Sequence, residues 1–326
     1  MVDQVTFTLD GREVSALPGE TIWEVARREG TTIPHLCHKP AKGYRPDGNC
    51  RACMVAIEGE RVLAASCIRQ PAEGMAVTTG GARERKARAM VLDMLAADMP
   101  ETPRDASSHF GEMAALTRAA PAPDGSAEPA PGSYGTGQAL EAEAPAGGAT
   151  PRADAPLPPK PADRIPLLDD SHVAMSVNLD ACIQCGLCVR ACREVQVNDV
   201  IGMAGRGADA YPVFDFADPM GDSTCVACGE CVQACPTGAL TPATIADTKN
   251  RETIDREVNS VCPYCGVGCQ LTFKIKDEKI KYVEGANGPS NQQRLCVKGR
   301  FGFDYVDHPH RLTVPLIRRT DAPPRV

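Results

Sequence analysis

The 326-residue chain is long enough for two or three domains, each with its own hydrophobic core. Its formal net charge of −7 at pH 7 offers no basic footprint for nucleic acid. The sequence also contains no run of eighteen apolar residues, the length needed to span a bilayer. We therefore expect neither nucleic acid nor a membrane as a partner.

The sixteen cysteines fall into four groups of four, with none left over. The opening stretch MVDQVTFTLDGREV alternates apolar and polar residues and has no apolar targeting core. We therefore expect a reducing, cytoplasmic setting, in which thiols bind metals rather than form disulfides. The groups are Cys37, Cys50, Cys53, Cys67; Cys182, Cys185, Cys188, Cys192; Cys225, Cys228, Cys231, Cys235; and Cys262, Cys265, Cys269, Cys296.

Residues 1–80 are predicted to form a compact α+β domain. Apolar and polar residues alternate in VTFTL, and the following DG marks the turn of a hairpin. In GETIWEVARREG, Thr21 and Glu24 have the spacing of a capping box, and Gly30 can end the helix. The segments MVAI and RVLAA predict two further strands. The cysteines between positions 37 and 53 therefore lie on a loop between helix and strand.

Residues 81–165 are predicted to connect this domain to the next. From Ala82 to Asp98 the pattern is helical, with an apolar side formed by Met90, Val91, Met94 and Leu95 and arginines opposite. Roughly two thirds of residues 119–162 are Ala, Pro or Gly, which cannot bury enough surface to offset the entropy of ordering. We expect this stretch to be a disordered linker.

Residues 166–250 contain two runs of the form C-x2-C-x2-C-x3-C, which indicates an internal duplication of a loop-plus-helix unit. In two-cluster ferredoxins the first three cysteines of one run hold one cubane, and its fourth cysteine ligates the other. Gly186 and Gly229 suit the tight wrap around sulfur, whereas Arg193 stands where proline is usual. The spacing predicts one 4Fe-4S cluster on Cys182, Cys185, Cys188, Cys235 and another on Cys192, Cys225, Cys228, Cys231.

Zinc is the alternative occupant of these thiols. Structural zinc sites usually pair two knuckles across a long spacer, whereas three thiols at C-x2-C-x2-C curl around one corner of a cube. The doubled run therefore favours iron–sulfur clusters.

The first group has the spacing C-x12-C-x2-C-x13-C, which is neither the plant-type nor the bacterial ferredoxin pattern. The segments IPHLCHKP, GNCRACMV and AASC resemble the 2Fe-2S domain that opens the large iron–sulfur subunit of complex I and related enzymes. This resemblance implies a β-grasp ferredoxin fold, with a 2Fe-2S cluster on Cys37, Cys50, Cys53 and Cys67. Zinc remains the alternative here too.

In residues 255–326, LTFKI and KIKYV predict a hairpin between the third and fourth cysteines of the last group. The segments VCPYCGVGCQ and LCVKGRFG resemble the small 4Fe-4S domain that opens the catalytic region of molybdopterin oxidoreductases. The resemblance implies a 4Fe-4S cluster on Cys262, Cys265, Cys269 and Cys296. It also implies that Lys298 bridges electron transfer between cluster and pterin. A solvent-exposed lysine with no such role is the alternative.

Taken together, the order of these motifs resembles the α subunit of NAD-dependent molybdenum or tungsten formate dehydrogenases. The resemblance implies an α+β protein with a β-grasp 2Fe-2S domain, a two-cluster 4Fe-4S domain and a small 4Fe-4S domain. It would carry one 2Fe-2S and three 4Fe-4S clusters. Electrons would pass between a metal bis-molybdopterin guanine dinucleotide centre in an adjoining catalytic body and a diaphorase partner subunit that holds FMN and NAD.

Two departures from this family stand out. Relatives often carry a further cluster held by one histidine and three cysteines, but no cysteine lies between Cys67 and Cys182, so His109 is expected to be a surface or helix-start residue. The catalytic metal ligand is also absent from this chain, so we expect the catalytic body elsewhere, in the same or another polypeptide. Two other functions stay open: an electron-input subunit of a complex I or hydrogenase type, and a non-catalytic carrier or assembly scaffold.

Overall fold

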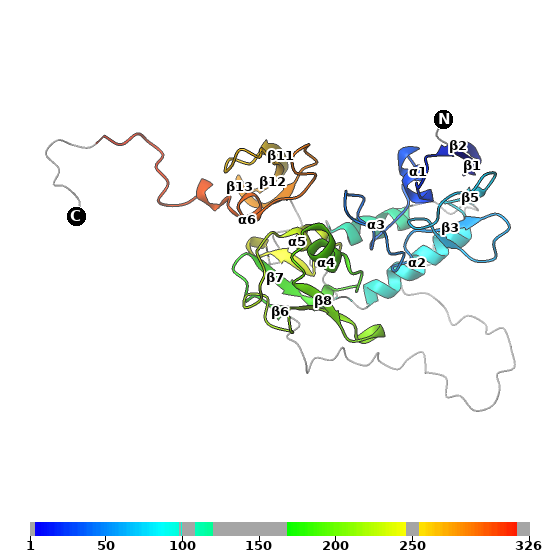
Figure 1. Ribbon diagram of the computed structural model, residues 1–326, viewed down its shortest axis with the longest axis horizontal. Helices are drawn as coiled ribbons and strands as arrows, with labels where there is room; N and C mark the ends of the chain where they lie inside the picture. Colours follow the sequence, from blue (N-terminus) through cyan, green and yellow to red (C-terminus); the bar gives the residue numbers. More distant parts are fainter. Residues whose placement is uncertain (1–3, 98, 100–107, 120–167, 246–253, 318–326) are drawn as a thin grey trace, which may run out of the picture.

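The computed structural model of the protein describes residues 4–97, 99, 108–119, 168–245 and 254–317. Three units follow one another along the chain, each built on its own sheet or sheets. In Figure 1 the first unit is blue and cyan, the middle unit green and yellow, and the last unit orange. The middle unit contacts both of the others, and these contacts bring the cysteine-bearing loops together.

The first unit is a five-stranded mixed sheet in the order β2-β1-β5-β3-β4, with the helix α1 (Ile22–Arg28) packed on it. The predicted hairpin and capping box are both present. The backbone N–H of Thr21 donates to Glu24 Oε2 at 2.8 Å, and that of Glu24 donates to Thr21 Oγ1 at 3.3 Å. The RVLAA segment contributes only its last two residues to the sheet. The strands are β1 (Val5–Leu9), β2 (Arg12–Ala16), β3 (Met54–Ile57), β4 (Ala64–Ala65) and β5 (Ala76–Thr78).

The expected connecting helix is present as α2 (Ala82–Ala97), but its predicted apolar face is only partly the packed one. Leu95 packs with Leu92, whereas Met90 and Met94 are 44% and 69% exposed. The side of α2 that packs on the first unit instead includes the buried Arg88. Its Nε and Nη2 donate to the Met54 carbonyl at 2.9 and 2.6 Å, so a satisfied guanidinium attaches the helix to the first sheet.

A further helix, α3 (His109–Ala119), lies between the first and middle units. The expectation that His109 starts a helix is confirmed. Its Nε2 lies 2.7 Å from the backbone oxygen of His35, and the next residue, Phe110, donates its N–H to the Pro236 carbonyl at 2.8 Å. The helix therefore contacts the first unit through one residue and the middle unit through the next.

The middle unit contains the predicted duplication. Each cysteine run turns into a short helix, α4 (Leu187–Arg190) or α5 (Glu230–Ala234), and α4 continues as a π-helical turn over Ala191–Val195. The two helices pack in one core with Met175, Leu187 and Val232. The strands form a three-stranded sheet and a hairpin, namely β6 (Leu168–Asp169), β7 (Met175–Asn178), β10 (Leu240–Pro242), and β8 (Ile201–Ala204) with β9 (Tyr211–Phe214).

The last unit is a three-stranded antiparallel sheet in the order β11-β12-β13, followed by α6 (Val297–Phe301). The predicted hairpin is present as β12 (Gln270–Lys276) and β13 (Lys279–Gly285). The first strand, β11 (Arg256–Val261), was not predicted. All six of its residues are exposed, so no buried side of it stands out in the sequence.

The predicted linker over residues 119–162 lies almost wholly outside the described residues. The domain limits at 80, 165 and 250 likewise stay predictions. In the part of the chain that the structure describes, no helix combines the length and the apolar character needed to cross a bilayer.

Candidate iron–sulfur centres

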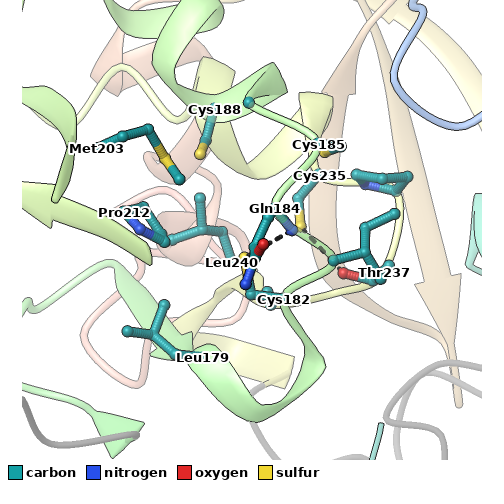
Figure 2. Close-up of a pocket in the computed structure, with 14 residues that line it drawn as sticks. Leu179, Cys182, Gln184, Cys185, Cys188, Met203, Pro212, Cys235, Thr237 and Leu240 are labelled. Atoms are coloured by element: carbon teal, nitrogen blue, oxygen red, sulfur yellow. Dashed lines mark hydrogen bonds between the residues drawn. The ribbon is translucent and has the colours of Figure 1, made fainter. Parts of the chain in front are cut away.

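The clearest site is a small cavity in the middle unit, whose lining includes Cys182, Cys185, Cys188 and Cys235. Figure 2 shows the four cysteines around it, with the apolar side chains of Met203, Pro212 and Leu179 on the left. Three of the thiols come from the first run, and the fourth comes from the second. Cys192, the fourth cysteine of the first run, is not among the lining residues.

Both runs bend around their thiols in the same way. Gln184 and Gly186 have φ angles of 57° and 70°, and the matching Ala227 and Gly229 have 54° and 69°. Left-handed backbone at the non-glycine positions costs roughly 1–2 kcal/mol, and such strain concentrates at functional sites. It turns backbone N–H groups toward sulfur, so Gln184 N donates to Cys182 Sγ and Ala227 N to Cys225 Sγ, both at 3.4 Å.

The second thiol group of the middle unit is formed by Cys192, Cys225, Cys228 and Cys231. Cys192 closes the group from the π-helical turn, where its sulfur accepts the Val200 N–H at 3.3 Å. Burial raises the pKa of the Cys231 thiol, and the neighbouring charges of the other three cysteines raise it further. The structure therefore brings the fourth cysteine of the first run to the first three of the second.

The cysteines of the first unit lie in two close pairs. The N–H of Cys37 donates to Cys50 Sγ at 3.5 Å, and the N–H of Cys50 donates to Cys37 Sγ at 3.4 Å. A hydrogen bond from the Cys50 thiol lowers the pKa of Cys37 to about 6, and one from Cys67 lowers that of Cys53 to about 7. The donating partners have raised pKa values. The charges of Cys37, Cys50 and Cys53 all act on Cys67, so the four thiols form one group.

The cysteines of the last unit are the most open group. Cys262 is buried and Cys269 half-buried, whereas Cys265 and Cys296 are exposed. The hairpin of β12 and β13 lies in the chain between Cys269 and Cys296. Cys296 immediately precedes α6. Partial burial raises the pKa of Cys269, and the charges of the other three cysteines raise it further. Lys298, the second residue of α6, is exposed.

The donor set of all four groups fits iron–sulfur clusters. None of the sixteen cysteines, all of which the structure describes, is in a disulfide, so every sulfur is available to bind a metal. Burial raises the pKa values of Cys185, Cys188 and Cys231 well above the ordinary thiol value, so thiolates there require nearby positive charge, which iron would supply. Within the described residues, no three His, Cys, Asp or Glu side chains converge as ligands of a single metal ion do.

Sequence reasoning missed the charged residues between these groups. Arg190 bonds the carbonyl of Cys37, and Arg300 bonds the carbonyl of Cys228 and pairs with Glu230. The only signal in the sequence was that Arg190 and Glu230 lie inside the cysteine runs, on helices too short to show an amphipathic pattern.

Comparison with known families assigns a type to each unit. Residues 2–81 match the 2Fe-2S iron-sulfur cluster binding domain, residues 181–239 the 4Fe-4S dicluster domain, and residues 255–308 the molybdopterin oxidoreductase Fe4S4 domain. These matches confirm the expected domain types and the expected classes of cluster, 2Fe-2S and 4Fe-4S. The assignment of individual cysteines, and of Lys298, stays a prediction.

Several curated proteins are similar along nearly the whole chain. A subunit of an NADH-quinone oxidoreductase of Rhizobium meliloti is 31% identical over 97% of this chain and 33% of its own length. "Putative formate dehydrogenase YrhE" of Bacillus subtilis is 26% identical over 98% of this chain and 34% of its own. The alpha subunit of the NADPH-Fe(3+) oxidoreductase of Geobacter sulfurreducens is 28% identical over 98% and 33%. The chain thus spans about a third of the length of these relatives.

Among solved structures, the chain resembles a chain of the NAD+-reducing [NiFe]-hydrogenase in its H2-reduced state. The TM-score is 0.53 at 25% sequence identity, covering 73% of this chain and 87% of the other.

Proposed function

We propose that this chain, which carries the iron–sulfur domains of the molybdopterin oxidoreductase family, is the electron-transfer portion of an NAD-dependent formate dehydrogenase. Electrons would pass between a molybdenum or tungsten bis-pterin site for formate and CO2 and a diaphorase partner that holds FMN and NAD. The observation that carries the proposal is the co-occurrence of three cluster-domain types in one chain, ending in the molybdopterin oxidoreductase Fe4S4 domain.

The proposed ligand sets follow the cysteine groups. The 2Fe-2S cluster takes the cysteines of the first unit, the two cubanes of the middle unit exchange their fourth ligands, and the last cubane takes Cys262, Cys265, Cys269 and Cys296. The cavity lined by Cys182, Cys185, Cys188 and Cys235 supports the exchange, because it combines both runs. Each cluster, when bound, supplies one-electron redox chemistry.

The chain's own residues hold these clusters and tune them. Backbone N–H groups aimed at sulfur, as at Cys182 and Cys225, stabilise thiolate charge and so adjust the reduction potential. Lys298, exposed beside Cys296, would face the pterin when the catalytic body covers it. We place the assembly in the cytoplasm.

Iron and acid-labile sulfide analysis tests the cofactor content. We expect about fourteen irons per chain, two for the 2Fe-2S cluster and four for each of three cubanes, with little zinc. Iron near zero, or zinc in its place, would reject the ligand assignments.

The reaction is tested on the native complex purified through a tag on this chain. We expect formate to support NAD reduction, and deletion of residues 255–326 to abolish it. Dye reduction by NADH, which reports on the diaphorase part, should survive that deletion. Unchanged formate activity after the deletion would favour the carrier or scaffold function.

A complex I or hydrogenase type of electron-input subunit is the second candidate. It is favoured by the similarity to the NADH-quinone oxidoreductase of Rhizobium meliloti and to the [NiFe]-hydrogenase chain. The segment LCVKGRFG, which resembles the 4Fe-4S domain of molybdopterin oxidoreductases, favours formate instead. Offering the tagged complex formate, hydrogen and quinone in separate assays distinguishes the candidates, because each expects a different substrate to exchange electrons with NAD(H).

A further inference from the structure

Two buried arginines lie where the cysteine-bearing loops of different units meet. Arg190 ends α4 in the middle unit, and Arg300 is on α6 in the last unit. Their exposed fractions are only 3% and 2%. Arginine is seldom buried to this extent without specific partners, because removing its charge from water is costly.

Arg190 joins the first and middle units. Its Nη2 donates to the carbonyl oxygen of Cys37 at 2.7 Å and lies 3.4 Å from that of Cys185. Its Nη1 contacts the carboxylate of Asp47, which is on the same loop as Cys37. The Arg190 guanidinium, from a predicted cubane motif, therefore donates a hydrogen bond to the backbone of Cys37, a predicted ligand of the 2Fe-2S cluster.

Arg300 joins the last and middle units. Its Nε donates to the carbonyl oxygen of Cys228 at 2.8 Å, its Nη1 to Gln233 Oε1 at 2.7 Å, and its Nη2 to Glu230 Oε2 at 3.3 Å. Glu230 is itself 1% exposed. Its other oxygen accepts bonds from Tyr44 at 2.8 Å and Lys39 at 3.1 Å. All three units therefore meet at this carboxylate.

The duplication relates the two arginines. When the runs beginning at Cys182 and Cys225 are aligned, Arg190 falls opposite Gln233. The first run supplies a guanidinium from its own helix, whereas the second has a glutamine there and binds the guanidinium of Arg300 from the last unit. In both runs the guanidinium approaches the backbone carbonyl of the second cysteine, Cys185 in the first run and Cys228 in the second.

We propose that Arg190 and Arg300 are positioning residues of the electron relay: each fixes one cubane loop against the neighbouring unit and raises the reduction potential of that cubane. The inference rests on the proposed function. A buried positive charge stabilises the reduced cluster, which is more negative by one electron, and low surrounding polarity strengthens the effect. Glu230 acts in the opposite direction on the second cubane, because its charge opposes that of the added electron.

The test is a redox titration of the full chain followed by electron paramagnetic resonance. Arg300→Gln is expected to lower the midpoint potential of the cubane on Cys192, Cys225, Cys228 and Cys231. Glu230→Gln is expected to raise it, because the amide keeps the shape and removes the negative charge. The matched control is Arg193→Gln. Arg193 is adjacent to Cys192 but 53% exposed and paired with Asp199, so water screens its charge.

Two further variants separate charge from geometry and extend the test to the first cubane. Arg300→Lys keeps the charge but cannot make the three-way fork, so the potential should stay near that of the wild type. In Arg300→Lys the last unit is held less firmly on the middle unit. The magnetic coupling between the second cubane and the last cluster should therefore become weaker or more heterogeneous. Arg190→Gln should lower the potential of the cubane on Cys182, Cys185, Cys188 and Cys235.

Opposite shifts in Arg300→Gln and Glu230→Gln, with none in Arg193→Gln, would support the inference. Wild-type potentials in both, or shifts of the same sign, would overturn it. If Arg300→Gln fails to hold the cubane, Glu230→Gln decides alone: an upward shift supports the proposal and an unchanged potential overturns it. Failure of the proposed function would look different: formate would not reduce NAD in the native complex, whereas the cubane potentials and their shifts in the variants would be unaffected.

Discussion

The carboxylate of Glu230 and the guanidinium of Arg300 form a buried ion pair, with Oε2 and Nη2 3.3 Å apart, although 70 residues separate them. Removing one partner of such a pair leaves an uncompensated buried charge, which typically costs about 3–5 kcal/mol. The pair exists only when the last unit is docked on the middle unit. Docking and cluster environment are therefore linked through the same two side chains.

The first prediction concerns Gly229, which lies directly beneath Arg300. A Cβ built at this position would come within 2.0 Å of Arg300 Cδ, and the backbone there is left-handed, with φ +69°. Gly229→Ala should therefore displace Arg300 and cost on the order of 3 kcal/mol. We expect a lower denaturant midpoint, measured by the visible absorbance of the clusters, and faster proteolysis between the middle and last units.

Gly186→Ala is the matched control for Gly229→Ala. Gly186 occupies the same place in the first run, with φ +70°, but its nearest neighbour, Arg190 Nη1, is 3.8 Å from the added Cβ. Only the backbone cost of about 1–2 kcal/mol should remain. Equal losses in the two variants would show that the Arg300 contact contributes nothing.

The second prediction concerns the attachment of α2 to the first sheet. Arg88→Ala removes both hydrogen bonds to the Met54 carbonyl and leaves that oxygen without these donors. A loss of about 1–3 kcal/mol is expected. Thermal unfolding monitored by circular dichroism would measure it. The exposed Lys86 on the same helix provides the control, since Lys86→Ala should change stability by less than about 0.5 kcal/mol.

Local patterns were the most informative part of the sequence. The capping box of Thr21 and Glu24 and the hairpin at β12 and β13 depend on residues that are close in the chain, and both are present. The cysteine groups were also predictable, because ligand spacing is set by the local wrap of the loop around sulfur. In the middle unit the cavity lined by Cys182, Cys185, Cys188 and Cys235 combines both runs, in agreement with the exchange that the spacing predicted, whereas the assignment of individual cysteines to clusters stays a prediction.

Long-range contacts could not be predicted in the same way. Arg88 is buried on α2 because a strand 34 residues earlier offers a carbonyl, and no periodicity within the helix indicates this. Glu230 and Arg300 look like ordinary surface residues until their units are docked. The strand β11 has no buried side chain and so lacks the alternation that reveals a strand.

The third prediction is that His109 orients α3 and holds no iron. Its Nε2 lies 2.7 Å from the His35 carbonyl, and its ring contacts the His35 ring at a tilt of 60°, with centroids 4.6 Å apart. His109→Ala should leave the iron content at its wild-type value of about fourteen while increasing proteolysis near α3. A loss of about four irons in metal analysis would instead make His109 a cluster ligand.

The fourth prediction concerns acid stability through His172 in the middle unit, whose pKa is lowered by burial and partly restored by Asp169. Its Nδ1 accepts the Ala174 N–H at 3.1 Å, which requires the neutral ring. The unfolded chain binds this proton below about pH 6.5 and the folded chain only at lower pH, so stability should fall as pH drops. His172→Asn keeps an acceptor without titrating. Between about pH 7.5 and pH 5.5, its denaturant midpoint should therefore fall less than that of the wild type, and parallel curves would contradict this account.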